Sequence, residues 1–341
     1  MIIVVVNYHY IATERPDSPR SIFPVSVDQL AAQLELLGRS LEFISRDQLI
    51  AAVRDGRALP ERSCLVTFDD GLQCQFELGL PVLESLGVPA LFLVPGQPLA
   101  EQRALHVHKV HYVRERLADG ELLRLLEPRV AGTDASLDAV SEEEAIRHYA
   151  YDEPEAAQVK YLLNVLLPVP AREAVLADVF TAVCSDERAF CDELYLSANQ
   201  VAALERQYCA VGAHSYAHEP LALLDPSALR RDLERNVAVL NAATGRRPEA
   251  ISYPHGSLEA VSQEVAAVAA GVGFVVGFTM ERALNRSLEL PLLLGRVDAN
   301  DAPGGTRPLF ELGRGEPVVH SGMASARQRY LSEVGGIASS P

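Results

Sequence analysis

The chain has 341 residues, of which 48% are hydrophobic and 22% are charged, enough apolar material for two ordinary domains or one large one. With 30 basic and 46 acidic residues it has a net charge of −16. Phosphate backbones and anionic lipids are repelled by such a surface, so we expect neither nucleic acid nor a membrane as a partner.

The N-terminus and the cysteines predict the compartment. Residues 2–6 form an apolar run that is too short for a secretory signal and has no basic residues before it. No stretch approaches the about 18 uninterrupted apolar residues of a membrane helix. The five cysteines are odd in number and contain no Cys-x-x-Cys pair, so we expect free thiols and a cytoplasmic protein. The oligomeric state is not predicted.

The first hundred residues predict strands and helices in alternation, which indicates a parallel sheet covered by helices. The expected order is strand 2–6, helix 26–37, helix 45–53, strand 64–68, helix 76–86 and strand 90–94.

The alternation stops at about residue 103 and resumes at about residue 207. Residues 103–206 read as several helices without a strand, and we interpret them as a helical insertion. The expected elements after it are strand 210–213, helix 227–244, strand 250–253, helix 258–270, strand 274–278 and strand 292–297. Residues 321–341 are expected to form a C-terminal tail.

Two adjacent carboxylates, Asp69 and Asp70, directly follow the predicted strand 64–68, and Gly71 allows a sharp turn after them. The carboxyl ends of parallel strands carry the active sites of α/β folds. Because neighbouring residues leave a strand in different directions, one carboxylate can bind a cation while the other acts as a base. A helix-capping aspartate in a tight turn is the alternative.

Two histidines, His214 and His218, follow the predicted strand 210–213. A spacing of four residues places both imidazoles on one side of a helical turn, where they can share a metal. With one aspartate they would supply two nitrogens and one oxygen, a set that suits zinc but also cobalt, nickel or iron. A third turn, Ile251-Ser-Tyr-Pro-His-Gly256, also lies at a strand end, and its backbone N–H groups could face an oxyanion.

These motifs resemble the polysaccharide deacetylase family, the group that shares the NodB homology domain. Thr67-Phe-Asp-Asp-Gly71 and His214-Ser-x-x-His218 match the first two family motifs, and three flanking segments add to the resemblance. It extends over about residues 1–100 and 207–300. The insertion resembles a subset of the family linked to the biosynthesis of surface polysaccharides and amino sugars, such as lipopolysaccharide or O-antigen.

The resemblance implies a deformed (β/α) barrel as a single catalytic domain, residues 1–320, which the insertion 103–206 interrupts. It also implies metal-dependent hydrolysis of an acetamide on a sugar. Asp70, His214 and His218 would hold the metal, most plausibly zinc, and Asp69 would be the general base for the attacking water. A backbone N–H group near residues 253–255 would help to stabilise the oxyanion.

The chain departs from the family pattern at two positions. The family carries an arginine near the position of Ser252, and Arg296 is the candidate substitute here. The histidine that serves the family as general acid is missing from residues 290–301, which leaves His9 and His255 as candidates. As a third possibility, His106, His108 and His111 in the insertion could act from a lid, and Lys109 beside them could contact an anionic substrate; a solvated helix face is the alternative for all four.

A cytoplasmic enzyme would act on a small precursor, so we expect a nucleotide-linked or lipid-linked amino sugar as substrate. Its phosphates would need a local basic patch, for which the candidates are Arg246, Arg247, Arg282 and Arg286. Two alternatives stay open: a deformylase or cyclic-amide hydrolase on the same barrel, and a non-catalytic scaffold.

Overall fold

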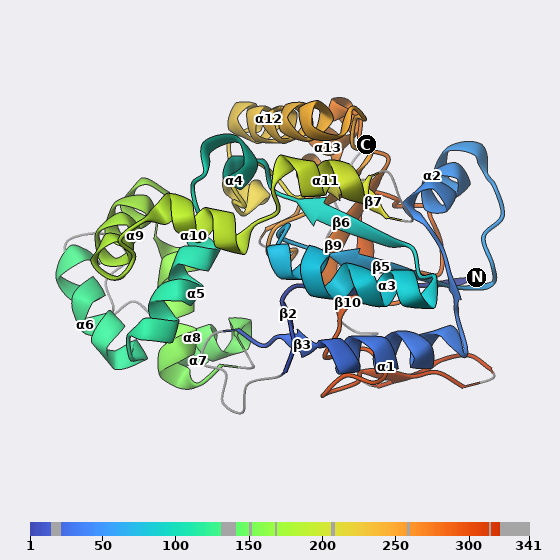
Figure 1. Ribbon diagram of the computed structural model, residues 1–341, viewed down its shortest axis with the longest axis horizontal. Coiled ribbons are helices and arrows are strands. Elements are labelled where there is room, and N and C mark those ends of the chain that lie inside the picture. Colours follow the sequence, from blue (N-terminus) through green and yellow to red (C-terminus); the bar gives the residue numbers. More distant parts are fainter. Residues whose placement is uncertain are drawn as a thin grey trace, which may run out of the picture. The chain divides into compact units, whose positions relative to one another are not determined.

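Short, buried strands rich in β-branched residues form the centre of the computed structural model, which describes residues 1–14, 22–130, 141–149, 152–167, 169–205, 209–257, 260–313 and 315–320 (Figure 1). The principal strands are β1 (Ile2–Tyr8), β4 (Glu42–Phe43), β5 (Arg62–Phe68), β6 (Ala90–Val94), β7 (Ala210–Ala213), β8 (Ala250–Ser252), β9 (Val276–Arg282) and β10 (Leu294–Asp298).

Seven of these strands close into a parallel barrel. Their order is β1-β10-β9-β8-β7-β6-β5, and the barrel closes where β5 pairs with β1 over seven residues, from Ile2 opposite Arg62 to Tyr8 opposite Phe68. β4 pairs with the other edge of β5. The deformed (β/α) barrel implied by the motifs is therefore confirmed. All seven strands run in the same direction, so their carboxyl ends meet at one rim.

Helices surround these strands, and three of them begin at a capping box in which a serine and a glutamine satisfy each other's backbone N–H groups. Ser26 and Ser45 are the N-caps of two helices that the sequence predicts. The longer helices outside the strands are α1 (Val27–Gly38), α2 (Arg46–Asp55), α3 (Leu80–Leu86), α11 (Ala198–Leu204), α12 (Pro226–Thr244) and α13 (Gln263–Val272) (Figure 1).

Three short helical elements and two small strand pairs also belong to the barrel part of the chain. The short helical elements are α4 (Gly96–Glu101), the π-turn η1 (Gln75–Gly79) and the 3₁₀ turn η4 (Leu221–Leu223). β2 (Ile11–Ala12) pairs in parallel with β3 (Val25–Ser26), and β11 (Phe310–Glu311) pairs antiparallel with β12 (Val318–Val319).

The chain divides into two units. The first contains residues 1–15, 24–101 and 194–341, and the second contains residues 16–23 and 102–193. The second unit is helical, with its own apolar core, and its helices are α5 (His106–Arg116), α6 (Asp119–Val130), α7 (Glu142–His148), α8 (Pro154–Tyr161), the π-turn η3 (Leu162–Leu166), α9 (Val169–Val183) and α10 (Glu187–Leu194).

Both lysines of the chain are buried in ion pairs of the second unit. Lys109 Nζ lies 2.9 Å from a Glu187 oxygen, and Lys160 Nζ lies 2.8 Å from both oxygens of Asp152. The sequence offered Lys109 as a contact for an anionic substrate, and its carboxylate partner within the same unit argues against that role.

The largest differences between predicted and observed elements concern two helices and the strand predicted at 274–278, which is β9 (Val276–Arg282), and the predicted tail cannot be compared. The predicted helix 258–270 starts too early, because Ser262 is the N-cap and α13 begins at Gln263. The predicted helix 76–86 begins as the π-turn η1 and continues as α3. The predicted tail, 321–341, lies outside the described residues.

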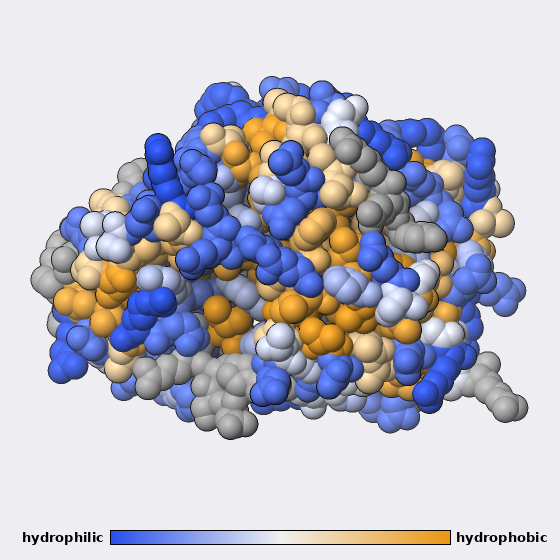
Figure 2. Space-filling model, in the orientation of Figure 1, coloured by the Kyte–Doolittle hydropathy of each residue, from blue (hydrophilic) through white to orange (hydrophobic). Residues whose placement is uncertain are grey.

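Hydrophilic side chains cover much of the face shown in Figure 2, with smaller hydrophobic areas between them. No helix in the described ranges is both long and apolar enough to cross a membrane.

Candidate active site

The turn that follows β5 carries both aspartates at the rim. The Asp69 N–H donates to the carbonyl of Tyr8 and so extends the pairing of β5 with β1. Asp70 and Gly71 then adopt left-handed φ angles of 75° and 61°. Glycine is required at position 71, because a Cβ there would lie 2.9 Å from the side chain of Val94.

The two histidines lie in a loop after β7, and not on a helical turn as their spacing suggests. Ser215 and His218 both have left-handed φ angles, 55° and 58°, which no α-helix contains. The loop nevertheless brings both rings to the same carboxylate: Nε2 of His214 and Nε2 of His218 each lie 3.4 Å from Asp70 Oδ1. The two imidazoles therefore lie at one carboxylate, as a shared metal would require, but the predicted helical turn is wrong.

Ser252, at the end of β8, fixes the orientation of the His214 ring. His214 Nδ1 lies 3.1 Å from the Ser252 carbonyl oxygen and 2.6 Å from its Oγ, and that hydroxyl donates to Asp69 Oδ1 at 2.9 Å. Since both groups beside Nδ1 then serve as acceptors, we assign the ring proton to Nδ1. The lone pair of His214 Nε2 is thus directed toward Asp70.

The three side chains Asp70, His214 and His218 fit a divalent metal. Each offers one ligand atom, these atoms lie within 4.8 Å of one another, and all three residues are buried. Burial lowers the pKa of His214, but the carboxylates of Asp69 and Asp70 outweigh it and raise the pKa. A cation bound between the two rings and Asp70 would neutralise the charge of the Asp70 carboxylate. Two imidazoles with one carboxylate form a ligand set that suits zinc and related metals.

Arg296 of β10 binds Asp69 in a bidentate ion pair. Its Nη2 lies 2.6 Å from Asp69 Oδ2, and its Nη1 lies 2.8 Å from Oδ1. The guanidinium also donates to Asn7 Oδ1 at 2.9 Å and to the Thr279 carbonyl at 3.2 Å. The guanidinium is fully buried, and it lies beside Asp69, where the sequence analysis placed it as the candidate substitute for the family arginine.

The environment of Asp69 keeps its carboxylate ionised. Burial alone would raise the pKa of Asp69, but the opposing effects of the Arg296 guanidinium and of His214 are larger and lower the pKa to about 2. Asn7 adds a donor, since its Nδ2 lies 3.3 Å from Asp69 Oδ2. Asp69 is therefore a charged, oriented acceptor beside the candidate metal ligands.

Asn7 and Gln75 are site residues that the sequence analysis missed. Asn7 is a fully buried polar residue near the end of the apolar strand β1, a signal that was readable in the sequence. Gln75 donates through Nε2 to the carbonyls of Asp69 and His9 and accepts from the Leu72 N–H, so it ties the two rim turns together. Its role depends on the packing of η1 and could not be predicted from local pattern.

The third motif forms the expected turn, but it contributes fewer backbone donors than predicted. The Tyr253 N–H donates to the Phe278 carbonyl in the sheet, and the Gly256 N–H donates to the Pro254 carbonyl. Tyr253 therefore does not stabilise an oxyanion through its N–H group. His255 lies in this turn with a left-handed φ of 62°.

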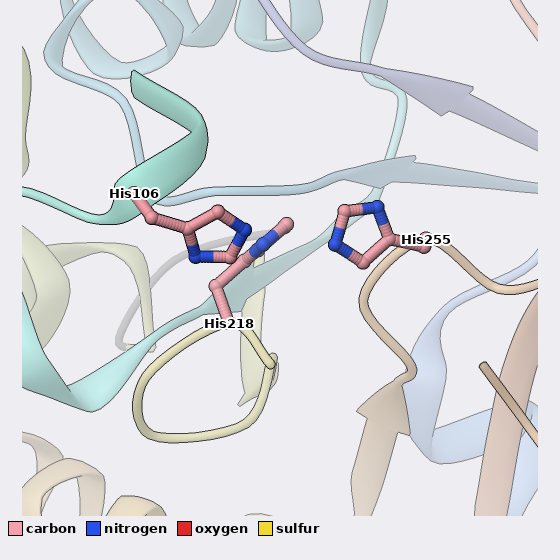
Figure 3. Close-up of side chains that lie close together, drawn as sticks. All are labelled: His106, His218 and His255. Atoms are coloured by element: carbon pink, nitrogen blue, oxygen red, sulfur yellow. The ribbon is translucent and has the colours of Figure 1, made fainter. Parts of the chain in front are cut away.

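The two candidates for the general acid lie at different places on the rim. The rings of His218 and His255 are edge to face with centroids 5.1 Å apart, and Figure 3 shows these two histidines on separate loops. His9 Nε2 lies 3.5 Å from Asn7 Nδ2. His106, also labelled in Figure 3, belongs to α5 of the second unit.

Three of the four arginines predicted to bind phosphate lie at the opposite end of the barrel. Arg246 and Arg247 precede β8, and Arg286 follows Asn285, which pairs with Ile3 at the start of β1. Only Arg282, at the carboxyl end of β9, lies at the end that carries the metal ligands. Each of the four has a partner nearby. Arg246 binds Asp47 and Glu205, and Arg247 donates to the Val272 carbonyl. Arg286 binds Glu316, and Arg282 binds Asp301.

Residues 179–276 match the family model described as polysaccharide deacetylase. This segment includes the histidine loop and the third motif. No curated protein matches the chain.

Several solved structures share the fold. The IcaB structure from Ammonifex degensii has 18% identity and a TM-score of 0.54, with 87% of this chain and 91% of that chain covered. The Streptococcus pyogenes deacetylase PplD in complex with acetate has 14% identity and a TM-score of 0.53, covering 87% and 92%. A de-N-acetylase from Aggregatibacter actinomycetemcomitans has 15% identity and a TM-score of 0.52, covering 90% and 98%.

At these identities the structures establish the fold, and the family match covers the segment with the histidine loop and the third motif. Together they indicate an enzyme of the deacetylase type, which acts on an acetamide C–N bond. The predicted resemblance to the polysaccharide deacetylases is thereby confirmed: residues 179–276 match the family model, and the chain has the fold of the solved structures.

Proposed function

We propose that the chain is a metal-dependent hydrolase that removes the N-acetyl group from an amino sugar. The observation that carries the proposal is the convergence of Asp70, His214 and His218 beside the buried Asp69–Arg296 pair. These residues come from three segments far apart in the sequence, 69–70, 214–218 and 296, and meet in the barrel. The family match supports the type of bond, and the donor set supports the need for a metal.

Asp70, His214 and His218 would hold the metal, which would polarise the acetamide carbonyl and make a water molecule more acidic. Asp69 accepts the proton of the attacking water at its carboxylate. Arg296 keeps that carboxylate charged and oriented. The low pKa of Asp69, about 2, ensures that the acceptor is ionised in the neutral range.

The departing amine needs a proton, and we propose that His9 or His255 supplies it. The two single glutamine variants, His9→Gln and His255→Gln, separate these candidates. Loss of a general acid slows the release of a poor leaving amine much more than that of an activated aniline. The variant whose deficit on the sugar substrate largely disappears on an acetylated nitroaniline identifies the acid. If both variants keep wild-type rates on the sugar, neither histidine is the acid.

For the substrate we propose a precursor of a surface polysaccharide, with the amino sugar linked to a nucleotide or a lipid, and we propose the cytoplasm as the compartment. Three of the four arginines considered as phosphate-binding residues lie at the amino end of the barrel. Of the four, Arg282 is therefore the one that could bind a phosphate of the substrate at the candidate site. A substrate panel should therefore compare unlinked, nucleotide-linked, lipid-linked and polymeric N-acetyl sugars.

The decisive experiment measures acetate released by the purified protein with added zinc or cobalt. We expect release that requires metal and is lost in Asp69→Asn and Asp70→Asn. Release of formate, or ring opening of a cyclic amide, would instead assign one of the other hydrolase reactions. A protein that binds no transition metal and releases no product would be a scaffold, and the proposal would be wrong.

A further inference from the structure

The conformation of the loop that carries His214 and His218 depends on contacts with the rest of the barrel. The loop is not a helix, and two of its five residues, Ser215 and His218, have left-handed backbone angles that disfavour residues with a side chain. One internal bond, from the His218 N–H to Ser215 Oγ at 2.8 Å, closes it. Such a conformation persists only where the surrounding structure fixes it, so the groups that contact this loop decide where the two imidazoles lie.

Helix α12 contacts the loop through two polar side chains one helical turn apart. Asp232 accepts the Tyr216 N–H at Oδ1, 2.8 Å away, and the Ala217 N–H at Oδ2, 3.2 Å away. Asn236 is fully buried and donates through Nδ2 to the Ser215 carbonyl and, at 3.1 Å, to the Val94 carbonyl. Residues at i and i+4 share one face of a helix, so the pair forms a single polar surface against the loop.

The N-terminus of α4 also binds the loop. The Gly96 N–H donates to the Ser215 carbonyl at 3.3 Å, and the Gln97 N–H donates to the Tyr216 carbonyl at 2.8 Å. Gly96 also permits close approach, because a Cβ there would lie 2.7 Å from the Tyr216 ring. The backbone between the two histidines is therefore bound by two helices, α12 and α4.

The polarity of each contact is specific. Both oxygens of Asp232 face N–H groups, and the Asn236 amide nitrogen faces two carbonyls. Burial raises the pKa of Asp232 to about 6, against the two backbone N–H groups that lower it. A partly desolvated carboxylate and a buried amide cost free energy unless their hydrogen-bond partners are in place. These two side chains therefore favour the loop conformation that presents those partners.

We propose that Asp232 and Asn236 are positioning residues that fix the spacing of His214 and His218, so that both imidazoles reach one cation with Asp70. The inference rests on the proposed metal-dependent function and deepens it. It assigns a role in metal affinity to helix α12, which contributes none of the three candidate metal ligands.

Isosteric swaps test the proposal, because they reverse the polarity of a contact and leave its shape unchanged. Asp232→Asn places a donor opposite a backbone N–H, and Asn236→Asp places an acceptor opposite two carbonyls. The controls are Glu234→Gln and Asn241→Asp, which make the same chemical changes at exposed positions of the same helix. The double variant Asp232→Asn with Asn236→Asp restores the wild-type net charge.

The measurement is the dissociation constant of cobalt(II) or zinc alone, from competition with a chelator, at a temperature where every variant is folded by circular dichroism. We expect each swap to weaken metal binding about 10- to 100-fold. The controls should bind as the wild type does, and the double variant should bind at least as weakly as either single variant.

A merely structural role would lower the melting temperature of the metal-free protein and leave the dissociation constant unchanged, and that result overturns the inference. Recovery of wild-type affinity in the double variant also overturns it, since it would trace the effect to net charge. If the wild type binds metal but releases no acetate from any sugar, the proposed function fails while this inference is still measured. If a swap prevents folding, Asn236→Ala and Asp232→Ala replace it in the same assay.

Discussion

Replacing Arg296 by glutamine would remove the cation that binds Asp69 and leave a carboxylate buried among the barrel strands. The two hydrogen bonds that are lost, at 2.6 and 2.8 Å, join charged groups. Each such hydrogen bond contributes about 1.5–3 kcal/mol. Breaking a buried ion pair at one partner costs about 3–5 kcal/mol, because the other charge remains desolvated. We therefore expect Arg296→Gln to lower the free energy of unfolding by about 4 kcal/mol.

A matched control shows whether burial causes this effect. Arg286 and Glu316 form an ion pair with a nitrogen–oxygen distance of 2.8 Å, but both side chains are more than half exposed. Exposed pairs contribute about 0–1 kcal/mol. Arg286→Gln should therefore cost less than about 1 kcal/mol, although the same residue type is replaced and the ion-pair distance is similar.

A double-mutant cycle isolates the pair. Asp69→Asn leaves the guanidinium of Arg296 buried without its carboxylate and should also be strongly destabilising. The double variant buries neither charge, so it should be more stable than the sum of the single effects predicts, by about 3 kcal/mol. Urea unfolding with a chelator present, followed by circular dichroism, measures this without a contribution from bound metal.

Two results would refute the reasoning. Either Arg296→Gln costs no more than Arg286→Gln, or the effects of the two single variants simply add in the double variant. Should Arg296→Gln fail to fold, Arg296→Lys keeps the charge while it loses the bidentate geometry, and we then expect a smaller but measurable loss.

Three further predictions concern the rim. Gly256→Ala should destabilise the protein far more than Gly245→Ala, as measured by differential scanning calorimetry. Both glycines have left-handed φ angles, but only a Cβ at position 256 would collide with the backbone of Met280. Zinc at a hundred times its dissociation constant should stabilise the wild type by about 2.7 kcal/mol, and His214→Ala should lose most of that gain in a thermal shift assay. Ser252→Ala removes the hydroxyl between the base and a metal ligand, and we expect about a tenfold loss of kcat in the acetate assay with little change in KM.

The strands that carry the candidate site were largely predictable from the sequence. β6 and β7 have the predicted bounds, and Asp69, Asp70 and His214 were expected at strand ends because buried β-branched runs are short and polar residues stop them. Closed parallel topology then brings those ends to one rim. Local pattern was sufficient for β6 and β7 because both strands are buried at every position and contain only apolar residues and glycine.

The conformations between the strands were harder to predict, and the histidine loop shows why. A spacing of four residues is equally compatible with a helical turn and with a loop that doubles back, and the choice depends on what the loop packs against. Here the groups that decide it are Asp232 and Asn236, which lie on a helix that begins eight residues after the loop. A pattern read over five residues contains no information on those contacts.

Arg296 and Arg246 show the same limit for charged residues. Both were considered for roles at the site, yet only Arg296 lies beside Asp69, and nothing in the composition of either segment distinguishes them. What separates them is position along the strand: Arg296 lies inside β10, with its guanidinium directed into the barrel, whereas Arg246 precedes β8 at the amino end. A buried arginine within a barrel strand requires a buried anion, and Asp69 is that anion. The identity of the partner therefore follows from topology and charge balance together, which is why the register of the closed barrel had to be known before the pair could be assigned.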